Sequence, residues 1–190
     1  SVTYDHDKNF MLFLYRDNYK SIEDLSQKEL RLAGLRINPK KNIGSRITYY
    51  NNVKIKNLKS KNPEINDIIG IPNNPLIANI NWSPNQKNIA FTNTSSDGVR
   101  LWVLNLESRS LTKLSDLKLN SNIGDVINWV NDNEIIVKVI PENKQNLIDQ
   151  DGIVPMGPTI SSNEGENAQN RTYQDLLKNK TDEFNFEQLV

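Results

Sequence analysis

Ile80-Asn81-Trp82-Ser83-Pro84-Asn85, followed by Ile89-Ala90-Phe91, is the stretch that decides the fold, because the chain repeats it. The second copy is Ile127-Asn128-Trp129-Val130-Asn131-Asp132, followed by Ile135-Ile136-Val137, and its tryptophan lies 47 residues after the first. In both copies an apolar stretch ends at a tryptophan, polar residues suited to a turn follow, and a second apolar stretch begins. This order predicts two strand-turn-strand units of the same kind.

A second pair of segments recurs at almost the same distance. Val53-Lys54-Ile55-Lys56-Asn57-Leu58 matches Leu101-Trp102-Val103-Leu104-Asn105-Leu106 at a spacing of 48 residues. Repeats of about 40 to 50 residues built from short strands are typical of β-propeller blades, in which each four-stranded sheet buries its faces against its neighbours. The predicted fold class is therefore all-β with short helical insertions, a partial β-propeller of about two to three four-stranded antiparallel blades. Because a closed propeller usually has at least about four blades, we expect the chain to be part of a larger one.

Strands are expected wherever short apolar runs are bounded by turn-forming residues. These strands cover residues 9–15, 47–50, 53–58, 77–82, 89–94, 99–106, 111–114 and two stretches between 126 and 140, with a hairpin turn at Asn51-Asn52. Ser21 and Asp24 form a capping pattern that predicts a helical stretch ending near Gly34. Two short helices are expected near the other end, over residues 173–179 and from Thr181 to Leu189.

These elements divide the chain into four segments. Residues 1–45 hold the first strand and the short helical insertion, and residues 46–141 hold the propeller blades with their repeat of about 47 residues. Residues 142–171 are rich in Asn, Gln, Ser, Gly and Pro and are expected to form a long polar loop. Residues 172–190 hold the short helices and the start of a further blade.

The composition excludes several classes of function. The 23 basic residues balance the 23 acidic ones without a block of like charge, so we expect neither nucleic acid nor a membrane as a partner. The absence of cysteine excludes disulfides, thiolate metal sites and a cysteine nucleophile. The stretch Asp149-Gln150-Asp151-Gly152 lacks the acids that a calcium loop needs at its ends, and no Gly-rich phosphate loop occurs. We therefore expect no cofactor and no metal.

Several segments resemble a known family, in order as well as in content. They are Leu30-Arg31-Leu32-Ala33-Gly34-Leu35-Arg36-Ile37-Asn38-Pro39, Trp82-Ser83-Pro84, Leu101-Trp102-Val103, Val154-Pro155-Met156-Gly157-Pro158 and Arg171-Thr172-Tyr173-Gln174-Asp175-Leu176-Leu177-Lys178-Asn179. Together they resemble the amino-terminal propeller of the prolyl oligopeptidase family of serine peptidases, in its glutamyl-endopeptidase-like branch, which includes dipeptidyl aminopeptidase-like proteins. The resemblance runs from Phe10 to Leu189. The chain departs from it at two turns, with Asn85-Gln86 in place of Asp-Gly and Asn131-Asp132-Asn133 in place of Pro-Asp-Gly.

The resemblance implies a parent protein that is a serine peptidase, exported and in bacteria periplasmic. In that family the propeller covers an α/β-hydrolase domain with a Ser, Asp and His triad, whose serine lies in a Gly-x-Ser-x-Gly turn. No serine of this chain has that pattern, and its one histidine is His6, so we expect no catalytic residue here and no hydrolysis by this chain alone. The expected partners are a peptide substrate and the carboxy-terminal α/β-hydrolase domain, with the propeller controlling access. The first residues lack the features of a signal peptide, so any targeting segment is expected to lie outside this chain.

Three arginines are candidates for contact with an acidic substrate, because a guanidinium binds a carboxylate through two hydrogen bonds. They are Arg36, Arg46 and Arg171. Structural salt bridges are the alternative, and commoner, use of such residues. His6 stands in a polar stretch and is expected to be solvated.

The three tryptophans, Trp82, Trp102 and Trp129, also have two interpretations. Large rings suit the apolar space between sheets and can donate the indole N–H to a nearby carbonyl, so we expect them to pack between blades. A stacking platform for a ligand is the alternative.

Two other functions fit the same repeats. A non-catalytic periplasmic propeller that docks a protein or ligand has the same radial blades. If the residues instead fold as an independent small β domain, incomplete stacking leaves open sheet edges, and we then expect the chain to self-associate through edge strands.

Overall fold

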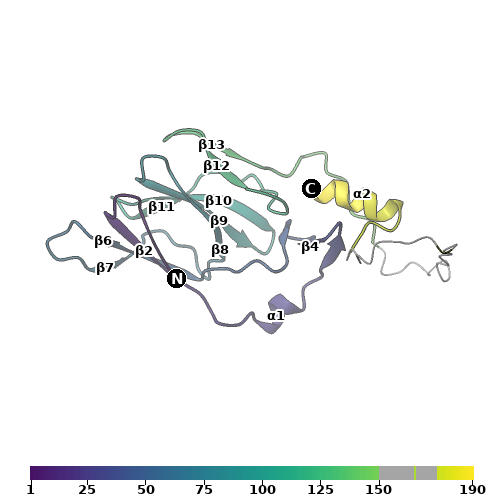
Figure 1. Ribbon diagram of the computed structural model, residues 1–190, viewed down its shortest axis with the longest axis horizontal. Helices are drawn as coiled ribbons and strands as arrows, with labels where there is room; N and C mark the ends of the chain where they lie inside the picture. The colour runs from purple at the N-terminus through teal and green to yellow at the C-terminus, as the bar shows by residue number, and fades with distance from the viewer. Residues whose placement is uncertain (150–164, 166–174) are drawn as a thin grey trace.

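Antiparallel sheets make up most of the regular secondary structure of the described residues, and the helices there are few and short (Figure 1). The computed structural model describes residues 1–149, 165 and 175–190. The predicted all-β class with short helical insertions is confirmed.

Two four-stranded sheets carry the repeated segments. The first has the strand order β1-β2-β6-β7, and the second has the order β11-β10-β9-β8. Their strands are β1 (Val2–Tyr4), β2 (Phe10–Tyr15), β6 (Asn52–Asn57), β7 (Ile65–Asp67), β8 (Ile77–Trp82), β9 (Asn88–Ser95), β10 (Gly98–Asn105) and β11 (Ser110–Lys113). The spacing of 48 residues aligns β6 with β10, so each strand of the first sheet has a counterpart in the second.

Two smaller sheets and two helices complete the described residues. The hairpin of β12 (Ile127–Trp129) and β13 (Ile135–Val137) contains the second tryptophan unit. A three-stranded sheet of β3 (Leu30–Leu32), β4 (Leu35–Asn38) and β5 (Ile43–Gly44) is inserted between β2 and β6. The helices are α1 (Ile22–Leu25) and α2 (Lys180–Leu189).

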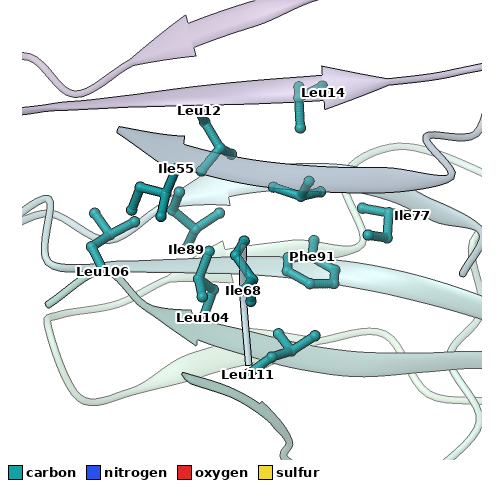
Figure 2. Packing of buried hydrophobic residues seen from close by; sticks show 11 residues of the cluster. Leu12, Leu14, Ile55, Ile68, Ile77, Ile89, Phe91, Leu104, Leu106 and Leu111 are labelled. Atoms are coloured by element: carbon teal, nitrogen blue, oxygen red, sulfur yellow. The ribbon is translucent and has the colours of Figure 1, made fainter. Parts of the chain in front are cut away.

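Strands β9 and β10 bury side chains on both faces of the second sheet, because alternate residues of a strand point to opposite sides. On one face Ile89, Phe91 and Leu104 join Leu12 and Ile55 of the first sheet in one apolar cluster (Figure 2). Each fully buried side chain of this size contributes about 1.5–3 kcal/mol to folding. This cluster therefore holds the first two sheets together.

The other face of the second sheet packs against the β12–β13 hairpin. Ala90, Val99 and Leu101 form a second cluster with Ile127. Val103 lies directly opposite Ala90 in the β9–β10 register and packs against the same cluster. The second sheet is thus covered on both faces by other sheets, an arrangement consistent with part of a β-propeller.

The tryptophans pack between the sheets, as expected. Trp82 and Trp102 lie against the first cluster, and Trp129 lies against the second. The indole Nε1 of Trp129 donates to the backbone oxygen of Asn81 at 3.2 Å, and the amide of Asn81 donates to the backbone oxygen of Ile127 at 3.0 Å. The repeated Asn-Trp pair therefore joins β8 to β12, its counterpart in the next hairpin.

A third copy of the turn lies near the start of the chain, where no tryptophan marks it. Asp5 Oδ1 accepts the backbone N–H five residues later at 2.6 Å, and Ser83 Oγ accepts the N–H five residues later at 3.0 Å. The fourth residue of each turn is left-handed, with φ of 55° at Lys8 and 60° at Gln86. The β1–β2 turn is thus the structural counterpart of the β8–β9 turn.

These equivalent turns are linked to one another. The backbone N–H of His6 donates to Gln86 Oε1 at 3.2 Å, and the backbone N–H of Asn85 donates to Asp132 Oδ1 at 2.8 Å. Gln86, which is a departure from the expected turn sequence, therefore supplies one of the side chains that join neighbouring turns, and Asp132, the residue that the second turn retains, supplies the other.

The predicted helix that ends near Gly34 is wrong over most of its length. Only α1 is helical, and Ser21 caps it by accepting the N–H of Asp24, as its capping pattern predicted. Ala33 and Gly34 have φ of 49° and 80°, so the chain reverses there and pairs β3 with β4. A helix cannot pass through two left-handed residues.

The predicted hairpin turn at Asn51-Asn52 is also wrong. Asn52 begins β6, and the strand expected over residues 47–50 is reduced to Tyr50, which forms an isolated bridge with Ile77 of β8. The chain crosses between two sheets at this point, so Tyr50 pairs with β8 and does not form a hairpin with the segment that follows it.

Near the other end, the predicted helix over residues 173–179 lies partly outside the described residues, and residues 176–178 are not helical. The second predicted helix is α2, which starts one residue earlier than expected, with Asn179 as its cap. Most of the expected loop, residues 142–171, lies outside the described residues.

Candidate functional site

The connection between β2 and β6 is the largest difference between the two four-stranded sheets. In the second sheet, Ser96 and Asp97 suffice to join β9 to β10, whereas in the first sheet residues 16–51 separate the equivalent strands. Hairpin loops are usually about two to five residues long, and longer connections in compact domains are often functional. The 36 residues of this insertion are therefore the first place to look for a site.

The insertion is held in place from two sides. Leu32 and Ile37 of its small sheet form a buried cluster with Leu189 of α2, so the helix covers the sheet (Figure 1). On the other side Ile43 forms a bridge with Ser121, which lies between β11 and β12. The insertion is thus a packed element of the fold, which gives its side chains defined positions.

Further polar contacts fix α2 and the insertion. The Asn120 amide donates to the backbone oxygen of Leu189 at 3.1 Å, and the Asn122 amide donates to the same oxygen at 2.6 Å. Lys144 Nζ donates to Asn42 Oδ1 at 2.5 Å, and burial lowers the pKa of this lysine.

A cleft of about 650 Å³ opens within the insertion. Its lining comes from two stretches of the insertion, within residues 16–31 and 38–51, together with Leu76. This volume lies in the range of about 300–1,000 Å³ that small-molecule sites occupy. Burial raises the pKa of the Tyr49 hydroxyl in the cleft, so this group stays neutral at ordinary pH.

Glu29 is the central acid of the cleft wall. It accepts hydrogen bonds from the hydroxyl of Ser45, from Arg31 Nε at 3.0 Å and from Arg36 Nη1 at 3.0 Å. The Ser45 hydroxyl, followed by Arg31 and Arg36, lowers the pKa of Glu29 from 4.5 to about 2. Glu29 is therefore ionised at any physiological pH and is already occupied by donors of the protein itself.

The structure places the three candidate arginines differently. Arg36 forms ion pairs with Glu29 at 3.0 Å and with Asp175 at 3.9 Å, so it has the structural role that was the alternative expectation. Arg46 is exposed, lines the cleft, and has no ion pair within the described part of the chain. Arg171 lies outside the described residues.

Two further cations of the cleft, Arg16 and Lys41, were not singled out from the sequence. The sequence could have indicated Lys41, because residues 36–46 hold four basic residues and no acidic one. Arg16 lies far from that stretch along the chain and is brought to the cleft only by folding.

Other features of the described residues give weaker candidates. A second cleft of about 600 Å³ lies between β3 and α2, and Lys28 and Asp149 form an ion pair of 2.8 Å on its wall. The side chain of His6 is 92% exposed, in agreement with a solvated histidine. No group of three or more His, Asp or Glu able to hold a metal occurs among residues 1–149, 165 and 175–190, and neither described helix is long and apolar enough to cross a membrane.

Comparison with known proteins relates the chain to peptidases. Two relatives, from rice (Oryza sativa subsp. japonica) and from Arabidopsis thaliana, are each named probable glutamyl endopeptidase, chloroplastic. The rice protein is 34% identical over 194 aligned residues, covering 95% of this chain, and the Arabidopsis protein is 31% identical over 194, covering 96%.

The chain spans only 20% of the length of each of these relatives. No family model matches the chain, and no solved structure matches it.

Proposed function

We propose that this chain is the amino-terminal propeller portion of an exported serine peptidase of the prolyl oligopeptidase family, and that it controls peptide access to an α/β-hydrolase domain outside residues 1–190. The observation that carries the proposal is the similarity to peptidase-named relatives along 95% of the chain, over only 20% of the relative's length. The stacked sheets support it, because this is how neighbouring propeller blades pack.

The side chains of the chain agree with a role in access rather than in bond cleavage. A Ser, Asp and His triad needs a histidine held against its serine, and the only histidine, His6, has a 92% exposed side chain with Asp7 beside it. The insertion, by contrast, provides a cleft of about 650 Å³, a size found in ligand-binding sites. We therefore assign binding to this chain and acyl transfer to the proposed hydrolase domain.

The test is peptide hydrolysis by the product of the complete reading frame. We expect hydrolysis of short peptides but not of folded proteins, and replacement of the serine in a downstream Gly-x-Ser-x-Gly turn by alanine should abolish it. Residues 1–190 alone should hydrolyse neither substrate. Unchanged hydrolysis in the alanine variant would contradict the proposal.

A downstream sequence that contains only further blades would contradict the peptidase assignment as well. That outcome favours the other candidate, a non-catalytic docking propeller. A location outside the cytosol is part of the same proposal, and the relatives, whose names place them in the chloroplast, support it. Fractionation of the native cells should find the protein outside the cytosol. A purely cytosolic protein would contradict this part of the proposal.

A further inference from the structure

The β1–β2 turn differs from the equivalent β8–β9 turn in the charge that it carries. The two turns share their backbone, with the same hydrogen bond at Asp5 and at Ser83 and a left-handed fourth residue in each. In the β8–β9 turn the first and third side chains are bonded to each other, because the hydroxyl of Ser83 donates to Asn85 Oδ1 at 2.9 Å. The shared backbone therefore brings the first and third side chains of the β1–β2 turn close together.

In the β1–β2 turn both of these positions are acids. Asp5 stands where the other turn has serine, and Asp7 stands where it has asparagine, so no hydroxyl proton joins the two side chains. Carboxylates placed so close repel each other, and a bound cation relieves that repulsion. Within the described part of the chain, Asp7 has no hydrogen-bond partner, and its one ion-pair contact is with the ring of His6 at 3.9 Å.

Two buried oxygens of the same turn also lack a donor. Asp5 is 0% exposed, and its Oδ1 accepts the N–H of Phe10, but its Oδ2 accepts no hydrogen bond from the described residues. Asn9 Oδ1 is likewise buried and accepts none from them. A buried carboxylate oxygen without a partner costs free energy, and a cation bound to it offsets that cost. The turn therefore offers acceptor oxygens that a cation can use.

The spacing of these residues is that of calcium ligands. Asp5, Asp7 and Asn9 occupy alternate positions, as do the first three ligands of a calcium loop, and calcium prefers carboxylate and amide oxygens. The turn is a β-hairpin and not a helical calcium loop, since Phe10 and Arg16 stand where such a loop has its glycine and its last glutamate. Water must therefore complete the shell around an ion held here.

From these observations we propose that the β1–β2 turn binds a calcium ion through the carboxylates of Asp5 and Asp7 and the amide oxygen of Asn9. Because water supplies the other ligands, we expect a dissociation constant of about 10⁻⁴–10⁻³ M, as in extracellular calcium modules. The site combines two acids with an amide, a combination that the sequence-based expectation of no metal did not consider.

The position of the turn gives such an ion a structural role. The backbone N–H of His6 in this turn donates to Gln86 in the β8–β9 turn at 3.2 Å. An ion that fixes the first turn therefore also stabilises its contact with the second sheet. This inference does not rest on the proposed function, because it holds for a peptidase and for a docking propeller alike.

The test measures calcium binding by residues 1–190 after treatment with EDTA, using equilibrium dialysis against ⁴⁵Ca²⁺ at constant ionic strength. In the ¹⁵N-labelled chain, calcium should shift the backbone amide signals of residues 5–10 more than those elsewhere. Calcium at about ten times its dissociation constant should raise the ratio of folded to unfolded chain in urea about tenfold. Magnesium should bind more weakly, because it demands a nearly ideal octahedron of ligands.

The β8–β9 turn supplies the matched variant, Asp5→Ser, which copies Ser83. Its hydroxyl can accept the N–H of Phe10 and donate to Asp7, so the variant should fold, while its affinity for calcium should fall at least about tenfold. In EDTA it should be at least as stable as the unaltered chain, because one of two adjacent negative charges is gone. The control is Asp125→Asn, since Asp125 is exposed and its side chain has no partner among the described residues. This control should bind calcium as the unaltered chain does.

Several results would each overturn this inference. They are the absence of calcium binding, equal affinity in Asp5→Ser and Asp125→Asn, amide shifts centred outside residues 5–10, and binding of magnesium as tight as that of calcium. A lower stability of Asp5→Ser in EDTA would also overturn it, because Asp5 would then stabilise the turn through its own hydrogen bond without any ion.

Discussion

Replacing Glu29 by Gln removes the charge that organises the cleft wall. The unaltered carboxylate accepts from the Ser45 hydroxyl, from Arg31 at 3.0 Å and from Arg36 at 3.0 Å. A hydrogen bond to a charged group contributes about 1.5–3 kcal/mol to stability. The Glu29 side chain is 23% exposed, however, so water can partly replace the hydrogen bonds that the substitution removes. We therefore expect Glu29→Gln to lower the free energy of unfolding by about 2 kcal/mol, or the midpoint by about 4–8 °C.

The pH dependence gives an independent check of the same contact. The folded-state pKa of Glu29 is about 2, below its ordinary value of 4.5, so its contribution is fully present above about pH 5 and is lost as the pH falls towards 2. Urea unfolding at a series of pH values should show the unaltered chain and Glu29→Gln converging as the pH falls.

The control is Glu64→Gln, because Glu64 is exposed and its side chain has no partner among the described residues. This variant should stay within about 0.5 kcal/mol of the unaltered chain. If Glu29→Gln is as stable as Glu64→Gln at pH 7, or if the difference does not shrink at low pH, the account of the cleft wall is refuted.

Three further predictions concern the sheets. Leu104 is 0% exposed between the first two sheets, so Leu104→Ala should lower the free energy of unfolding in urea by about 2–5 kcal/mol. Leu114 is 52% exposed, and Leu114→Ala should lower it far less. Trp129→Phe should lower the free energy of unfolding by about 1 kcal/mol in the same assay, because the backbone oxygen of Asn81 then lacks the hydrogen bond from the indole N–H. An unchanged free energy of unfolding would mean that this hydrogen bond does not stabilise the fold. The edge strand β13, which has Ile136 63% exposed, should make residues 1–190 self-associate in sedimentation, and Ile136→Lys should restore the monomer; an unaltered chain that is strictly monomeric would contradict this.

The repeated tryptophan unit made the sheets predictable. Strands β8 to β11 were expected within about two residues of their observed bounds, because each is a short, largely apolar run bounded by turn residues. The sequence did not reveal the β1–β2 turn as a copy, because the hydrogen bond that Ser83 Oγ accepts in the β8–β9 turn is accepted there by the carboxylate of Asp5. Equivalent hydrogen bonding, which no identity count detects, defines that third copy.

The insertion was the part that the sequence concealed. Ser21 and Asp24 did cap a helix, but the left-handed residues at Ala33 and Gly34 created a hairpin where helical periodicity was expected to continue. Arg46 was one of three arginines named as candidates for binding a carboxylate, but the cleft that it lines forms only when residues 16–31 and 38–51 meet in the folded chain. Tertiary packing, and not local propensity, therefore creates the candidate site.

The most direct test of the central claim, that this chain belongs to a serine peptidase and leaves its chemistry to another domain, is labelling with a fluorophosphonate. This reagent reacts covalently with activated serines, and mass spectrometry then locates the modified residue. In the complete gene product we predict one modified serine, in a Gly-x-Ser-x-Gly turn beyond residue 190, and no modification of residues 1–190. Labelling of a serine within residues 1–190, or no labelling anywhere in an intact and folded product, would contradict the claim.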